Sequence, residues 1–343
     1  MSELQVKWVP LPRLSLFKNF FIRLYAYFVP NYVSRCNAVF VQAENSTAME
    51  LCTHIKVPII FDIHGDVVAE QNPSKENYQE LATTDEAFRE KVLLSKAQLL
   101  IVNSQNLIEV LHNRHEYILS NIIVLPCATR IDRFTRHLQD RESIRKRLGL
   151  NDKLVLCYLG GLSSWQCVGQ TIKLVAELKK RKSNIHFLLI TPDDTSAYDS
   201  ELLKIGNPDL DYTILSLSAE DVPRMLSAAD AGLLLRALSP INYVASPTKC
   251  GEYLSSGVPV ITTKHAGDAT WIIKKELAGY ILENEEFETK DLVKIELFLA
   301  DVEKNRNEWS AKTTRVASSY YNWSVYESAY FQACAYLENI KLS

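Results

Sequence analysis

The chain has 343 residues, a length that favours two domains over one. Its 38 Lys and Arg residues against 41 Asp and Glu residues give a formal net charge of −3, which argues against a generally basic nucleic-acid binder. With 47% hydrophobic and 23% charged residues, the composition is typical of a globular enzyme or binding protein and excludes a disordered or fibrous chain. Because the chain has no excess of positive charge, any anion-binding site must be formed by a local group of basic residues.

The seven cysteines are widely spaced and never form a Cys-x-x-Cys pair, so we expect reduced thiols. The first ten residues lack the apolar stretch of a signal peptide, and no segment reaches the roughly 18 apolar residues that a membrane span needs. Together these features predict a cytoplasmic protein.

Short apolar runs alternate with longer amphipathic segments, which is the pattern of parallel sheets covered by helices. The chain is therefore predicted to be an α/β protein with two domains. The predicted strands of the first domain are residues 6–11, 38–42, 58–63, 99–103 and 122–126, and those of the second are residues 154–160, 186–191, 212–217, 231–236 and 258–263.

Residues 129–150 are charged and contain no predicted strand, which indicates a hinge. We place the boundary after residue 140, with an N-terminal domain over 1–140 and a C-terminal domain over 141–321. The last segment, 322–343, has aromatic and apolar residues at helical spacing, and we expect this helix to pack back near the first domain.

Residues 12–36 combine leucines and aromatic residues with several basic residues. A helix of this kind can lie on an anionic membrane surface, which would give peripheral contact with the inner membrane face. A helix packed on the N-terminal sheet explains the pattern equally well.

The most informative stretch is residues 245–262. Ser246 is a suitable N-cap, Pro247 fits the first helical position and Gly257 can end a helix, so we expect a short helix from Pro247 to Ser255. The free backbone N–H groups at its start, in the segment of Ser246, Pro247 and Thr248, form an arrangement with the charge of Lys249 that holds phosphate. Pro247 contributes position here and no N–H group.

Glu252 lies three residues after Lys249 and therefore shares its helix face, one turn deeper. From there its carboxylate could accept hydrogen bonds from a vicinal diol such as ribose. A capped surface helix with a weak Lys–Glu pair is an equally good explanation of these residues alone.

Arg236 ends the predicted strand 231–236, and open parallel sheets bind ligands beyond the carboxyl ends of their strands. The runs LLLR, N-x-V-A-S-P-T-K and E-Y-L-x-x-G-x-P-V-I resemble those of the retaining, sugar-nucleotide-dependent GT-B glycosyltransferases, the glycosyl transferases group one. Segments 96–111, 122–134, 157–178 and 267–282 are also similar to that family, whose bacterial polysaccharide-assembly members the chain resembles most.

The resemblance implies two Rossmann-like domains that face a cleft, and transfer of a sugar from a UDP- or GDP-sugar to a glycan or lipid-linked acceptor. It places catalytic groups at His64, Arg236 and Lys249. The implied donor-binding residues are Gly160, Gly161, Gln166, Ser246, Pro247, Thr248 and Glu252. A His in the segment 61–71 is, without the resemblance, more often a structural residue.

The chain departs from the family at three positions. Gly161 and Gln166 stand where many members have an Arg and a Lys that contact the diphosphate, and Val244 stands where a second Glu is common. The missing Arg and Lys, together with the short N-terminal region, motivate an alternative function, that of a non-catalytic GT-B-like subunit that binds a glycan or partners an active transferase. The family's first strand and glycine loop also have no counterpart before residue 6, so we expect an abbreviated N-terminal domain.

No cofactor or metal is expected. The sequence has no spacing typical of a metal site and neither a G-x-G-x-x-G nor a P-loop motif. Asp209-Leu210-Asp211 has the letters of the Asp-x-Asp pair of metal-dependent transferases, but it precedes a strand and is interpreted as a turn.

Overall fold

The computed structural model describes residues 41–43, 56–72, 74–75, 77–116, 121–135, 137–205 and 210–341, so the predicted strand 6–11 and the segment 12–36 lie outside the described residues. The chain divides into two compact units. The first comprises Met1–Val102, Leu111–Ile123 and Phe331–Ser343, and the second comprises Asn103–Val110 and Val124–Tyr330.

The first unit is built on a four-stranded sheet in the order β1-β2-β3-β4. The pairs β1–β2 and β2–β3 are parallel. Strands β2 and β3 are buried along almost their whole length, as expected for a sheet covered by helices. The strands are β1 (Val41–Ala43), β2 (Ile59–Ile63), β3 (Leu99–Val102) and β4 (Ile122–Val124), and the helices are α3 (Val67–Gln71), α4 (Tyr78–Ala82) and α5 (Asp85–Leu94). Two further helices belong to this unit in part, α6 (Gln105–His115) from Leu111 onward and α17 (Glu327–Lys341) from Phe331 onward.

The second unit contains a parallel six-stranded sheet in the order β10-β9-β8-β5-β6-β7. The chain runs outward from β5 to β7, returns to β8 beside β5, and continues outward on the other side to β10. The strand order therefore reverses between β5 and β8. The strands are β5 (Leu154–Leu159), β6 (Ile185–Thr191), β7 (Tyr212–Ser216), β8 (Ala231–Leu234), β9 (Val260–Thr263) and β10 (Gly279–Leu282).

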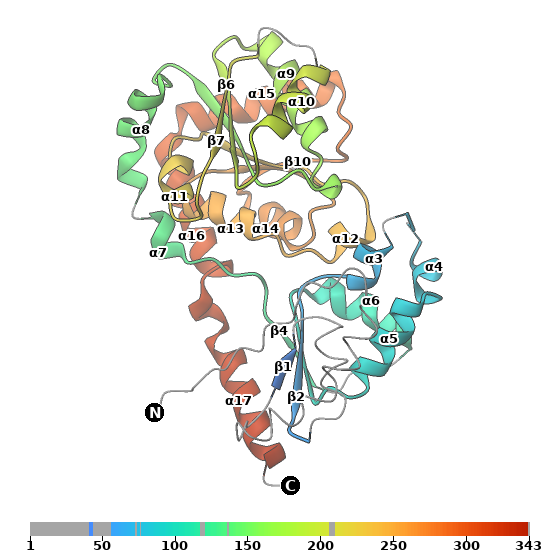
Figure 1. Ribbon diagram of the computed structural model, residues 1–343. Helices are drawn as coiled ribbons and strands as arrows, with labels where there is room; N and C mark the ends of the chain where they lie inside the picture. The colour runs from blue at the N-terminus through green and yellow to red at the C-terminus, as the bar shows by residue number, and fades with distance from the viewer. Residues whose placement is uncertain are drawn as a thin grey trace. The chain divides into compact units, whose positions relative to one another are not determined.

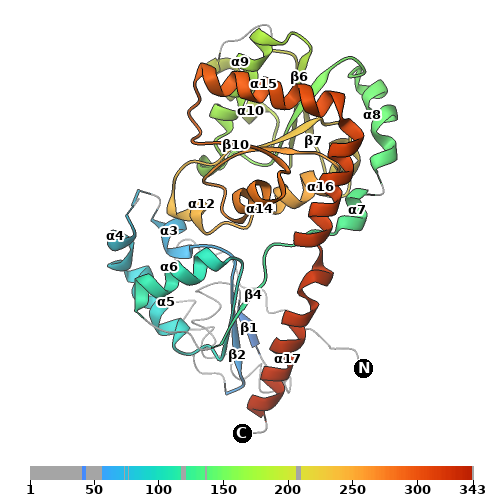
Figure 2. The ribbon, with the colours of Figure 1, turned by 180° about the vertical axis from the view of Figure 1, so that it is seen from behind.

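Helices cover both faces of this second sheet (Figures 1 and 2). One face packs on α9 (Val168–Arg181), α10 (Ser196–Ile205) and α15 (Thr289–Lys304). The other face packs on α7 (Ile131–Thr135), α8 (Arg141–Leu148), α11 (Val222–Leu226), α13 (Thr248–Ser255), α14 (Asp268–Glu276) and α16 (Arg306–Tyr320). Successive residues of β5 alternate between the two cores, with Leu154, Leu156 and Tyr158 on one side and Val155, Cys157 and Leu159 on the other.

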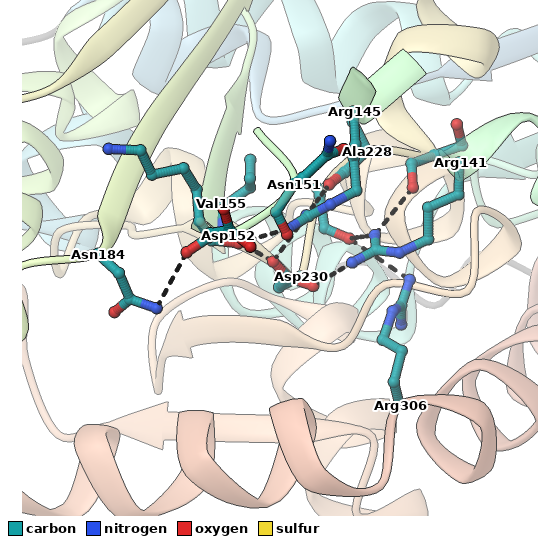
Figure 3. A network of polar contacts seen from close by, with 12 residues as sticks. Arg141, Arg145, Asn151, Asp152, Val155, Asn184, Ala228, Asp230 and Arg306 are labelled. Atoms are coloured by element: carbon teal, nitrogen blue, oxygen red, sulfur yellow. Dashed lines mark hydrogen bonds and ion pairs between the residues drawn. The ribbon is translucent and has the colours of Figure 1, made fainter. Parts of the chain in front are cut away.

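A buried charge network ties the amino end of β8 to the helices around it (Figure 3). Asp230 is 5% exposed, and its carboxylate pairs with Arg141 and, at 3.1 Å, with Arg145. The same carboxylate accepts the N–H of Val155 at 2.8 Å. Arg306 donates to the carbonyl of Gly257 at 2.5 Å, and burial lowers its pKa to about 10. This network joins α8, α16 and the sheet.

The predicted α/β class is confirmed, and each predicted strand that falls on described residues corresponds to an observed one. The strand β10 was missed. The predicted hinge folds as α7 and α8, and Val124–Asp140 groups with the second unit, whereas the sequence places the boundary after residue 140. Phe331–Ser343, from α17, groups with the first unit, where Asn121 Nδ2 lies 2.5 Å from the Tyr336 hydroxyl.

Candidate functional site

The predicted donor-binding residues of the second unit converge where its strand order reverses. Gly160 follows β5 directly, Arg236 follows β8 by two residues, and α13 begins at Thr248. In open parallel sheets, the carboxyl ends of the strands at such a reversal form the crevice in which ligands bind. The topology alone therefore selects this edge as a candidate site.

Lys249 extends across the glycine that ends β5. A Cβ on Gly160 would lie 1.8 Å from Lys249 Nζ, so only glycine leaves room for the ammonium. Nζ donates a hydrogen bond to Gln166 Oε1 and lies 5.4 Å from the centre of the Tyr158 ring. Burial and the nearby Arg236 lower the pKa of Lys249 to about 7.

Two tyrosines hold the glycine loop in place. The Tyr198 hydroxyl, which is fully buried, donates to the carbonyl of Gly160 at 2.6 Å. The Tyr158 hydroxyl lies 2.7 Å from the carbonyl of Gly161 and 2.9 Å from Gln166 Oε1. Because Gln166 Oε1 is close to both Tyr158 and Lys249, the orientation of its amide group is fixed.

Arg236 is a buried cation. Arg236 is 7% exposed, and its Nη1 donates a long 3.4 Å hydrogen bond to the carbonyl of Trp165. Nε is buried and forms no hydrogen bond, and burial lowers the pKa of the guanidinium. Among the described residues, neither Arg236 nor Lys249 forms an ion pair with a carboxylate. A buried guanidinium and a half-buried ammonium, neither of them paired with a carboxylate, favour binding of an anion.

The start of α13 differs from the prediction in detail. Pro247 is the N-cap and Thr248 the first helical residue, so the predicted N-cap at Ser246 is wrong by one position. Ser246 Oγ instead accepts the N–H of Cys127 at 3.1 Å and contacts Asp268, whose pKa burial raises to about 6. With no side-chain cap, the first N–H groups of α13 remain available to an anion beside Lys249.

The end of α13 is as predicted. Gly257 has φ +72°, and its N–H donates to the carbonyl of Leu254 at 3.1 Å. The N–H of Val258 donates to the carbonyl of Tyr253 at 3.0 Å, which completes a Schellman motif. This sharp stop sends the chain directly into β9.

Glu252 lies on the same helix one turn after Lys249. Burial raises the pKa of its carboxyl group, and the positive charges of Lys249 and Arg133 oppose that rise. The predicted contact of Glu252 with a diol stays a prediction.

The family departures have structural counterparts. A Cβ on Gly161 would lie 2.8 Å from Asp193 Oδ2, so this carboxylate occupies the space beside the loop. Val244 is fully buried and its carbonyl accepts the Ser104 hydroxyl at 2.7 Å, so this position serves packing. Asp211, of the Asp-x-Asp letters, pairs with Lys153 at 2.6 Å directly before β7, while Asp209 lies outside the described residues.

His64 lies in the first unit, in the loop that follows β2. Its side chain is 61% exposed, and Nε2 lies 3.3 Å from Asp62 Oδ1. The donor-binding groups described above all belong to the second unit. The predicted role of His64 towards the donor sugar therefore stays a prediction.

Sequence reasoning missed Tyr158, Tyr198, Asp193 and Asn242. Asn242 Nδ2 donates to the carbonyls of Ala237 at 2.9 Å and Trp165 at 3.2 Å, and so fixes the loop after Arg236. Asp193 follows β6 by two residues, and its place at a strand's carboxyl end was a usable signal.

Within the described part of the chain, no group of three or more His, Cys, Asp or Glu side chains could hold a metal ion. No helix in the same residues is long and apolar enough to cross a bilayer.

Comparisons with known proteins agree with the resemblance to glycosyltransferases. The family model described as "Glycosyl transferases group 1" matches residues 140–316, just over half of the chain. A curated protein of Bacillus subtilis (strain 168), "Putative glycosyltransferase YtcC", is 23% identical over 155 residues. That match covers 42% of this chain and only 36% of the relative.

Solved structures share the fold over nearly the whole chain. Sucrose-phosphate synthase from Thermosynechococcus elongatus has a TM-score of 0.74 at 17% identity and is matched over 97% of this chain and 81% of its own. Anabaena HepE in complex with UDP has a TM-score of 0.71 at 15% identity, over 90% and 81% of the two chains. The lipopolysaccharide glycosyltransferase WaaG has a TM-score of 0.68 at 18% identity, over 94% and 85%.

At these identities the structural likeness establishes the fold, which is the α/β fold of GT-B glycosyltransferases. The family follows from the sequence model, which spans the whole stretch from Asp140 through Arg236 and Lys249 to Val316. The chain belongs to the glycosyl transferases group 1.

Proposed function

We propose that this protein is a retaining glycosyltransferase that moves a hexose from a nucleoside diphosphate sugar to a glycan or lipid-linked glycan in polysaccharide or glycoconjugate assembly. Family membership supports transfer chemistry. HepE, whose structures hold UDP, UDP-glucose and glucose, supports a nucleotide-sugar donor and favours UDP over GDP.

One observation carries the proposal: the buried Arg236 and the half-buried Lys249 lie near each other at the strand-order reversal, and neither has an ion-pair partner among the described residues. Withdrawing two neighbouring cations from water is costly, and an anion at that place offsets the cost. The α13 N-terminus adds N–H donors to the same place. A diphosphate fits this combination of charge and donors.

The same groups would lower the barrier to transfer. When the bond between C1 of the sugar and the β-phosphate oxygen breaks, its electron pair leaves with the nucleoside diphosphate. The acceptor oxygen bonds to C1, and its proton passes to the departing phosphate oxygen. Arg236 and Lys249 would stabilise the charge that develops on the leaving group. Glu252 would accept hydrogen bonds from the ribose hydroxyls, and His64 would orient the donor sugar.

Nucleotide binding is the first test. We expect UDP or GDP to raise the melting temperature and CMP not to, because a ligand at about 100 times its Kd adds about 2.7 kcal/mol, or roughly 5–10 °C. A panel of nucleotide sugars with acceptor glycans then tests transfer, and NMR of the product anomer tests retention. A protein that no nucleotide stabilises would contradict the proposal.

Arg236→Ala tests the charge at the site, with a rate loss on the order of 10²- to 10³-fold expected. Arg181→Ala is the matched control, because Arg181 forms a two-pronged pair with Glu296 at 2.8 Å on an exposed surface. Near-normal turnover in Arg236→Ala would count against the assignment. Nucleotide binding with no turnover on any donor would favour the alternative of a non-catalytic partner subunit.

A further inference from the structure

In the first unit, four buried polar side chains connect the loop after β2 with α5 and with the C-terminal end of α6. Asp66 Oδ2 lies 2.5 Å from Arg114 Nη2, and Arg114 Nη1 lies 2.9 Å from Glu90 Oε2. The same Glu90 oxygen lies 2.6 Å from His115 Nε2. These side chains are between 0% and 7% exposed, so the network is closed to solvent.

Asp66 controls the geometry of this loop. Its second oxygen, Oδ1, accepts the N–H of Ala69 at 3.0 Å and so caps α3. Its backbone carbonyl accepts the N–H of Glu70 at 2.9 Å, which starts the same helix. One carboxylate thus sets both the start of α3 and, through Arg114, the distance of the loop from α5 and α6.

These buried charges stabilise the fold less than packed apolar side chains of similar size would. Charges withdrawn from water cost free energy that packed apolar side chains would not, and Arg114 Nε is buried without a hydrogen-bond partner. What the network provides is a fixed geometry, because an Arg with a carboxylate at each Nη group has one orientation. The loop it holds is the one that carries His64, two residues before Asp66.

We propose that the Asp66–Arg114 pair positions His64 for its part in transfer. The inference rests on the proposed function of the protein. His64 projects from the loop with its side chain 61% exposed and its Nε2 near Asp62. The buried pair beneath fixes the backbone from which that ring extends, so Asp66 and Arg114 act through His64 and touch no reacting atom.

Asp66→Asn is the informative variant. Asparagine still caps α3, because its side-chain oxygen can accept the N–H of Ala69, but it carries no charge for Arg114. We expect kcat to fall at least tenfold, since small misplacements of an orienting group cost up to about 10²-fold. The UDP-induced shift in melting temperature should stay unchanged, because the nucleotide-binding residues belong to the second unit.

A double-mutant cycle separates positioning from loss of stability. If Asp66 acts through His64, Asp66→Asn should lower kcat in the wild-type background and have little further effect in His64→Ala. An equal loss of kcat in the wild-type and His64→Ala backgrounds would overturn the inference, and so would a wild-type kcat in Asp66→Asn. Should Asp66→Asn fail to fold, Arg114→Lys keeps the charge without the two-pronged geometry, and wild-type kcat in that variant would overturn it as well.

Asp230→Asn is the matched control, since it makes the same change in a buried Asp–Arg network of the other unit (Figure 3). Asp230 precedes β8, whereas Arg236 follows that strand. We expect this variant to lose stability and, assayed below its melting temperature, to keep kcat. A wild-type protein without nucleotide binding or transfer would overturn the proposed function itself, a result distinct from a normal kcat in Asp66→Asn.

Discussion

The ammonium of Lys249 fills the space that a side chain on Gly160 would need, since a Cβ there would lie 1.8 Å from Nζ. Gly160 also has φ +147°, a conformation that residues with a side chain rarely adopt. The glycine after β5 therefore serves two purposes: it turns the chain and it opens the site to a cation from α13.

Gly160→Ala should weaken nucleotide binding at least tenfold, because the added methyl group displaces the ammonium that the phosphates need. Isothermal titration with UDP measures the loss. Gly149→Ala is the control, since Gly149 has φ +68° but no atom within 4 Å of an added Cβ. That variant should lose about 1 kcal/mol of stability through backbone strain and keep its affinity. Equal affinities in the two variants would contradict this account.

Lys249→Met should raise the melting temperature of the protein without nucleotide and reduce the shift that UDP induces. The folded protein lowers the pKa of Lys249 from 10.5 to about 7, so it disfavours the charged form relative to the unfolded chain. That penalty is complete below pH 7 and fades as pH rises towards 10.5. The gain in melting temperature should therefore be largest at pH 6 and smaller at pH 9. A variant less stable than wild type at pH 6 would refute this.

Nucleotide affinity should fall as pH rises above 7. The diphosphate favours the charged ammonium, so Lys249 takes up a proton on binding once the free protein has lost it. The fall approaches tenfold per pH unit until the higher pKa of the complex is reached. Calorimetry at pH 8 in buffers of different ionisation enthalpy measures the proton uptake. Lys249→Met should show none, and a flat affinity from pH 7 to 9 in wild type would rule out this role.

Much of the site was predictable because it follows local rules. Arg236 closes the apolar run of residues 231–236, two residues beyond the end of β8, and Gly257 stops a helix that starts near a proline. Strand ends and helix signals thus located both cations and the α13 N-terminus. The predicted strand 154–160 included Gly160 as its last residue, whereas β5 ends at Leu159 and Gly160 begins the loop.

The errors came from contacts between segments distant in the sequence. Ser246 has the chemistry of an N-cap, but its hydroxyl is engaged by Cys127 and Asp268, which no local pattern reveals. Tyr158 and Tyr198 look like core residues, and they are buried. Their hydroxyl partners are loop carbonyls and Gln166, brought near by the fold. The strand β10 has only four residues and begins with a glycine, which strand propensity disfavours.

Asp230→Asn should cost about 3–5 kcal/mol of unfolding free energy, because it leaves buried arginines without their carboxylate. Asp230 pairs with Arg141 and Arg145 and accepts the N–H of Val155, and the nearby Arg306 already has its pKa lowered by burial and by those arginines. Glu296→Gln provides the comparison, since the Arg181–Glu296 pair is partly exposed and its loss should cost less than about 1 kcal/mol. Urea denaturation measures both values. A loss in Asp230→Asn no larger than in Glu296→Gln would mean that the carbonyl oxygens around the arginines, such as those of Ser227 and Ala228, suffice to hold them.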